Sequence, residues 1–156
     1  MRSVLLRLSP DQVNALRSAL RRAGVNEIGG QIFGEQLAPS DFRATELTFQ
    51  KRNGTFTQFV VDLLQAAQDA MQFFGRTRHR YTRFNYIGEW HSHPSFEVSP
   101  SGTDIAAMRA LVSDREFRGT FAVLMIVRLD GDQLTCGAWL FDPSGHEQSV
   151  TLELLP

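Results

Sequence analysis

The sequence has little cysteine, no strong charge imbalance and no long apolar run. Cys136 is the one cysteine among 156 residues, which excludes an internal disulfide framework and a multi-cysteine zinc finger and favours a reducing cytoplasm. The formal net charge is -1, so nothing global favours nucleic acid or an anionic membrane as a partner. We find neither a basic, apolar leader nor a run that could span a bilayer, and we therefore expect a soluble, cytoplasmic protein without a membrane partner.

The length and hydrophobic content predict a single domain over residues 1–156. A chain of 156 residues with 42% hydrophobic residues can bury one sizeable core. Its first helix is marked by Ser9 as the cap, Pro10 at the first helical position and Gly24 after the end. Before this helix, residues 4–6 predict a short strand.

Later segments alternate between strand and helix patterns. Strands are predicted at residues 26–35, 42–50, 86–93, 120–127, 134–141 and 150–154, and helices at residues 57–75 and 101–114. The run 120–127 is apolar throughout, as expected of a central strand that is covered on both faces. This order predicts an α/β (α+β) architecture, in which a mixed β-sheet is flanked by three helices.

Two histidines and one aspartate have the spacing of a metal site. His91 and His93 are two apart on a predicted strand, so their side chains project from the same face. Pro94 ends the strand, and the helix that begins near Ser101 carries Asp104 in its first turn. Two imidazoles and one carboxylate leave one open position on a tetrahedral zinc ion, which is typical of a catalytic site.

Each half of this pattern has an ordinary structural explanation. Ser101 and Asp104 also fit a capping box, in which the two side chains bond the first backbone N–H groups of a helix. Two histidines on a strand can also be unrelated, one buried and one exposed. The combination of His91, His93, a proline and a Ser-x-x-Asp helix start favours the metal site over both explanations.

At these residues the sequence resembles the JAMM (MPN-plus, JAB/Mov34) zinc metalloproteases, in particular the compact bacterial members. The family motif is an upstream glutamate, His-Ser/Thr-His-Pro and Ser-x-x-Asp, with seven residues between the second histidine and the serine. Residues 91–94 and 101–104 reproduce it with that spacing. The resemblance implies a JAB/MPN-like (cytidine-deaminase-like) fold, and it implies that His91, His93 and Asp104 bind one zinc ion while Ser101 helps to hold the tetrahedral intermediate.

The upstream glutamate has two candidates. Glu27 directly precedes the glycine-rich residues 28–30, which is where family members carry the acidic residue that acts as general acid and base. Glu35 follows the same strand and would point inward if the pairing register differed. We favour Glu27. Adjacent glycines in this strand also indicate that another backbone or a ligand approaches closely.

The resemblance implies hydrolysis of the isopeptide or peptide bond after the C-terminus of ubiquitin or a ubiquitin-like protein. Partners would then be the conjugates of that protein, together with activating- and conjugating-enzyme-like proteins, and such bacterial systems include antiphage defence. Residues 95–99 adjoin the predicted metal and carry apolar Phe96 and Val98, so we expect an extended tail to pair with them. Two alternatives remain: a zinc amidohydrolase acting on a sulfur-carrier protein or a small-molecule amide, and a non-catalytic MPN-type scaffold.

Overall fold

The computed structural model describes residues 3–49, 73–78, 84–115, 117 and 119–155. Within these ranges the elements are, in chain order, β1 (Val4–Leu8), α1 (Pro10–Ala23), β2 (Gly29–Ala38), β3 (Asp41–Leu47), β4 (Phe84–Ser92), α3 (Gly102–Ser113), β5 (Ala122–Asp130), β6 (Gln133–Phe141) and β7 (Glu147–Leu154). The predicted helix at residues 57–75 lies mostly outside the described residues, of which 73–76 are helical. No helix in the described ranges is both long and apolar enough to cross a membrane.

The strands form one mixed sheet that closes on itself in the order β1-β3-β2-β4-β5-β6-β7. β1 runs parallel to both β3 and β7, and β4 runs parallel to β5, whereas the other neighbours are antiparallel. The sequence predicted the mixed sheet but not its closure, which depends on β1 pairing with a strand from the other end of the chain. β4 therefore has a hydrogen-bonded neighbour on each side, β2 and β5.

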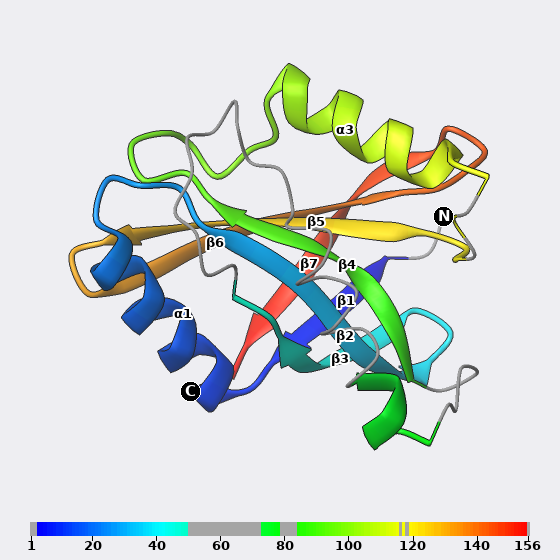
Figure 1. Cartoon of the computed structure of the whole chain (residues 1–156), viewed down its shortest axis with the longest axis horizontal. Coiled ribbons are helices and arrows are strands. Elements are labelled where there is room, and N and C mark those ends of the chain that lie inside the picture. The colour runs from blue at the N-terminus through cyan, green and yellow to red at the C-terminus, as the bar shows by residue number, and fades with distance from the viewer. Residues whose placement is uncertain (1–2, 50–72, 79–83, 116, 118, 156) are drawn as a thin grey trace.

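Helices α1 and α3 pack on opposite faces of the sheet (Figure 1). Leu16 and other apolar residues of α1 join Trp90, Met125 and their neighbours in the larger core. Met108 of α3 packs with residues from the other face of β5, such as Leu124. Because successive strand residues face opposite sides, the apolar run in β5 supplies both cores, as expected of a strand covered on both faces.

Local signals placed the first helix correctly. Ser9 accepts a hydrogen bond from the backbone of Gln12, whose side chain accepts one from the backbone of Ser9, so the two form a capping box. Gly24 has a positive φ of 60° after the helix end. The cap and the terminating glycine thus fix where the chain turns toward β2.

The glycine-rich segment lies against another backbone, as the sequence indicated. A side chain at Gly30 would overlap the carbonyl group of Thr48, which follows β3. Thr48 N–H donates to the carbonyl oxygen of Gln31 at 3.0 Å, and Thr48 Oγ1 accepts from Gln31 N–H at 2.8 Å. β2 itself begins at Gly29 rather than at residue 26 and extends to Ala38.

Candidate metal and catalytic site

The two histidines lie at the end of β4 and face the same side. His91 is the last but one residue of the strand, and His93 continues its pairing by donating its N–H to the carbonyl oxygen of Val127 at 2.9 Å. Both side chains are buried. The neighbouring strands β2 and β5 pair with this end of β4 on both sides. The two histidine side chains therefore face the same side, as the alternation in the sequence predicted.

Asp104 reaches the same point from the first turn of α3. Ser101 caps this helix, and its Oγ accepts a hydrogen bond from Asp104 N–H at 3.1 Å. One carboxylate oxygen of Asp104 accepts from Ser101 N–H at 2.8 Å. The other lies 3.2 Å from His91 Nε2. Asp104 therefore takes part in the capping box with Ser101 and in the cluster with the histidines at once.

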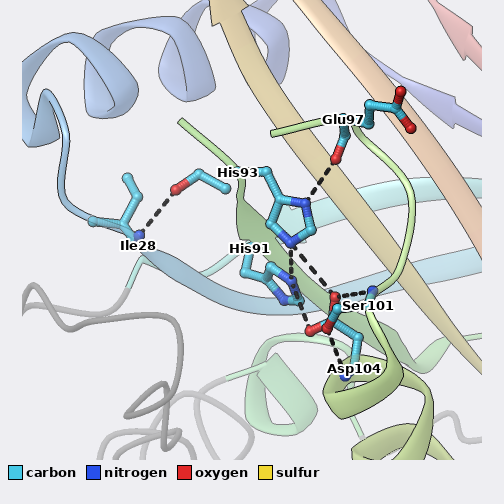
Figure 2. A network of polar contacts seen from close by, with 7 residues as sticks. Ile28, His91, His93, Glu97, Ser101 and Asp104 are labelled. Carbon is cyan, nitrogen blue, oxygen red and sulfur yellow. Dashed lines mark hydrogen bonds and ion pairs between the residues drawn. The ribbon is translucent and has the colours of Figure 1, made fainter. Parts of the chain in front are cut away.

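Figure 2 shows the three candidate ligands converging. Nε2 of His91 and Nε2 of His93 are 3.2 Å apart, and His93 Nε2 lies 3.5 Å from Asp104 Oδ2. One potential ligand atom from each residue falls within 4.8 Å of the others. Burial acts to raise the pKa of Asp104, but His91 and the hydrogen bonds with Ser101 outweigh it and hold that pKa below its ordinary value.

This donor set fits a divalent metal ion. Imidazole nitrogens and a carboxylate oxygen are ligands that zinc accepts, and three of them leave a position for water or substrate. His93 Nδ1 lies 2.8 Å from the carbonyl oxygen of Glu97, an acceptor. This contact places the proton on Nδ1 and leaves the lone pair of Nε2 facing the cluster, as outer hydrogen bonds do for metal-binding histidines.

Glu27 lies beside this cluster. It forms an isolated bridge just before β2, and its side chain is 6% exposed. Burial raises its pKa to about 7; the charge of His91 opposes this rise and that of Asp104 adds to it. Its Oε2 is buried and accepts no hydrogen bond from the described residues. The side chain is thus desolvated, near the candidate ligands, and free to take a proton.

Glu35, the other candidate, lies far from the histidines. Gly29 of β2 is opposite His91, whereas Glu35 is opposite Phe84, at the other end of β4. At roughly 3.4 Å per residue the intervening strand separates them by about 20 Å. Glu35 instead forms an ion pair with Arg43, at 2.5 Å. The structure therefore places Glu27 near the three candidate ligands and keeps Glu35 away from them.

The loop after His93 is held against the barrel. Arg128 donates to the carbonyl oxygen of Phe96 at 2.7 Å. A side chain at Gly137 of β6 would overlap the carbonyl oxygen of Val98, so the glycine lets the loop lie close. The Val98 side chain packs on the smaller core, but Phe96 is 55% exposed and its ring stands edge-on to His93. Of the two apolar residues, Phe96 is the accessible one.

Sequence reasoning assigned no role to Ser92, the residue between the histidines. Alternation places its side chain on the opposite face from them, and it is fully buried. Its Oγ accepts a hydrogen bond from the backbone N–H of Ile28 at 3.0 Å. The sequence pattern that could have indicated this bond is alternation, which places the polar Ser92 on the core face. A buried hydroxyl there needs a hydrogen-bond partner.

Comparisons with known proteins identify a family for this chain. Residues 9–142 match the family model described as prokaryotic homologs of the JAB domain. A CD-NTase/cGAS isopeptidase of Enterobacter hormaechei subsp. hoffmannii (strain UCI 50) is 27% identical over 138 residues, which are 80% of this chain and 67% of that protein.

Two solved structures are also similar. Protein DSY2949 from Desulfitobacterium hafniense superposes with a TM-score of 0.62 at 19% identity, over 96% of this chain and 92% of that one, which shows the fold alone. A JAB1/MPN domain protein from Archaeoglobus fulgidus is 18% identical over 98% of this chain and all of its own, with a TM-score of 0.48.

Proposed function

This chain belongs to the family of prokaryotic homologs of the JAB domain, and from that membership we propose that it is a zinc-dependent isopeptidase or peptidase. Its substrate would be the bond after the C-terminus of a ubiquitin-like protein. The name of the Enterobacter relative supports isopeptidase activity. The sequence resemblance to JAMM metalloproteases supports the choice of metal and of substrate class.

One observation carries the proposal: three side chains converge in a buried cluster, and a fourth buried carboxyl lies close enough for their charges to shift its pKa. His91 and His93 come from the end of β4 and the residue just after it, Asp104 from the start of α3, and Glu27 from the segment before β2. Burying a carboxylate beside three converging ligands lowers the stability of the folded chain. Groups of this kind are typical of functional sites. A non-catalytic scaffold would have no need of the complete set.

The chain's own groups divide the work of amide hydrolysis. His91, His93 and Asp104 would hold the metal. Zinc, when bound, supplies a Lewis acid that makes water acidic enough to act as a nucleophile near neutral pH. Glu27, with a pKa of about 7, is suited to take a proton from water as the oxygen attacks the carbonyl carbon and to deliver that proton to the leaving amine. No covalent enzyme intermediate is required.

Ser101 would stabilise the developing oxyanion. Its Oγ already accepts a hydrogen bond from Asp104 N–H. This arrangement leaves the hydroxyl proton available for donation. A donor of this kind is worth about 3 kcal/mol in the transition state.

An extended tail would approach along residues 95–99. The carbonyl groups of Phe96 and Glu97 are already bonded to Arg128 and His93. The tail would therefore use the other edge of the segment and the exposed Phe96 ring. We propose that the residues next to the cut must be small, because a side chain there would strike the backbone near the metal. Conjugates of a ubiquitin-like protein, and the activating- and conjugating-enzyme-like proteins of the same system, are the proposed partners.

A pair of fusion proteins tests the substrate. One carries a ubiquitin-like protein with a Gly-Gly end joined to a reporter, and the other carries bulky residues at that end. We expect cleavage of the first alone, mapped by mass spectrometry to the bond after the second glycine. Equal cleavage of both fusions, or cleavage elsewhere, would point to the broader amidohydrolase instead.

Two glutamate variants test the mechanism with the same fusion. Glu27→Ala should keep the fold and the metal yet lose activity by about three orders of magnitude or more. Glu35→Ala is the matched control, because Glu35 is equally buried but lies at the far end of β4. It should stay within about tenfold of the wild type. The opposite ranking would contradict the proposed general base.

A further inference from the structure

Ser92 makes an unusual pair with Ile28. The register of β2 and β4 places Gly29 opposite His91 and Gly30 opposite Trp90, so Ile28 continues it opposite Ser92. In a regular antiparallel pair of this kind, two opposed residues exchange two backbone hydrogen bonds. Here Ser92 N–H donates to the carbonyl oxygen of Ile28 at 2.9 Å, as expected.

The reciprocal bond goes to the side chain instead. Ile28 N–H donates to Ser92 Oγ at 3.0 Å, as the dashed line from Ile28 in Figure 2 marks. A hydroxyl oxygen on the core face thus takes the place of a carbonyl oxygen in the ladder. The bond to the side chain lies at Ile28, directly before the first residue of β2 and one residue after Glu27.

Glu27 lies next to this attachment in the chain. Its own Oε2 accepts no hydrogen bond from the part of the chain that is described, so the carboxylate has no anchor at that atom. The paired backbone of Ile28 is the neighbouring point at which the segment is tied to the strand that carries His91 and His93. The Ser92 hydroxyl thus accepts one of the two hydrogen bonds that tie the residue next to Glu27 to β4.

We propose that Ser92 is a positioning residue for the general base. It touches neither metal nor substrate, and acts by holding the backbone beside Glu27 at the distance from β4 that the reaction needs. This inference rests on the proposed function, since it assumes that Glu27 is the base. Misplacing a catalytic group by about 1 Å can cost about 100-fold in rate.

A similar bond elsewhere in β2 provides the matched control. Thr48 Oγ1 accepts from Gln31 N–H, while Thr48 N–H donates to the Gln31 carbonyl oxygen. Thr48→Val removes that acceptor, as Ser92→Ala removes the other. If the hydroxyls served stability alone, the two variants would behave alike. Of the two hydroxyls, only that of Ser92 bonds the residue next to Glu27.

The kinetic test compares these variants on the Gly-Gly fusion. Ser92→Ala should lower kcat by about 10- to 100-fold with KM within about threefold and metal content unchanged. Thr48→Val should keep kcat within about threefold. Ser92→Thr, which retains the oxygen, should recover most of the lost kcat. Equal kcat losses in Ser92→Ala and Thr48→Val would overturn the proposal.

A double variant shows whether Ser92 acts through Glu27. In a Glu27→Ala background, Ser92→Ala should cause no further fall in kcat, because the group being positioned is gone. An additional fall of the same size as in the wild-type background would overturn the proposal. A Glu27→Ala variant that retains full activity would instead refute the proposed function, and that single variant reveals it.

Amide hydrogen exchange supplies a readout that does not depend on activity. In the metal-free protein, we expect the Ile28 amide to exchange at least about tenfold faster in Ser92→Ala than in the wild type, with Thr48→Val unchanged at that site. NMR spectra resolve this single amide even if no substrate is cleaved. Unaltered protection of Ile28 in Ser92→Ala would show that the hydroxyl does not hold this segment.

Discussion

Glu89 should make the stability of the metal-free protein fall as the pH rises. It lies on β4 two residues before His91 and is buried. Tyr86 donates its hydroxyl proton to Glu89 Oε1 at 2.8 Å, while Oε2 accepts no hydrogen bond within the described ranges. Burial raises the pKa of this carboxyl from 4.5 to about 7, and the hydrogen bonds of Tyr86 and Gln31 oppose the rise only in part.

The sign and size follow from this shift. Well below the unfolded pKa of 4.5, the carboxyl is protonated in both the folded and the unfolded chain, so its ionisation does not lower the free energy of unfolding. As the pH rises toward and past about 7, the carboxyl ionises more easily in the unfolded chain than in the folded one. The free energy of unfolding therefore falls by roughly 3 kcal/mol in total. About 2.5 kcal/mol of this loss falls between about pH 5 and about pH 8.

Urea unfolding of the chelator-treated protein at these two pH values measures the effect. Glu89→Gln keeps the shape of the protonated side chain but cannot ionise, so the variant should lose about 2.5 kcal/mol less than the wild type between them. Glu97→Gln, at an exposed carboxyl, is the control and should follow the wild type. An unchanged pH dependence in Glu89→Gln would refute the reasoning.

Two further predictions test the metal cluster and the close backbone packing. By elemental analysis, the purified wild type should hold one zinc ion per chain. His91→Ala should lose most of this zinc, whereas His146→Ala should keep it. Equal zinc content in all three proteins would show that the site is misread. Gly30→Ala should lower the free energy of unfolding in urea by about 3 kcal/mol, because the added methyl group would collide with a neighbouring backbone carbonyl. Gly102→Ala is the control and should cause no loss, because a methyl group there meets open space. A Gly30→Ala protein as stable as the wild type would mean that this backbone approach is looser than described.

The convergence of the three candidate ligands could be predicted because each part of the cluster is local. Alternation alone puts His91 and His93 on one face, and a serine cap alone puts Asp104 in the first turn of a helix. What brings the parts together is the loop between them, whose length the motif fixes. The three candidate ligands were therefore readable from about fourteen consecutive residues.

The choice of glutamate could not be made by the same means. Glu27 and Glu35 are eight residues apart, so simple alternation assigns them to one face. Two long-range facts separate them: β2 pairs with β4 so that Gly29 meets His91, and the pairing shifts between Ile32 and Phe33. Register of this kind depends on contacts between distant segments. The bond from Ile28 to Ser92 escaped prediction for the same reason.

Closure of the sheet has a consequence for how the protein is made on the ribosome. β1 leaves the ribosome long before its partner β7, since Val4 pairs with Val150. Contacts so distant in sequence form slowly, and until they form the strand edges stay open to other chains. The histidine strand needs β2, which is already synthesised, and β5, which is not. The end of β4 that carries His91 therefore stays incomplete until its second neighbour, β5, arrives.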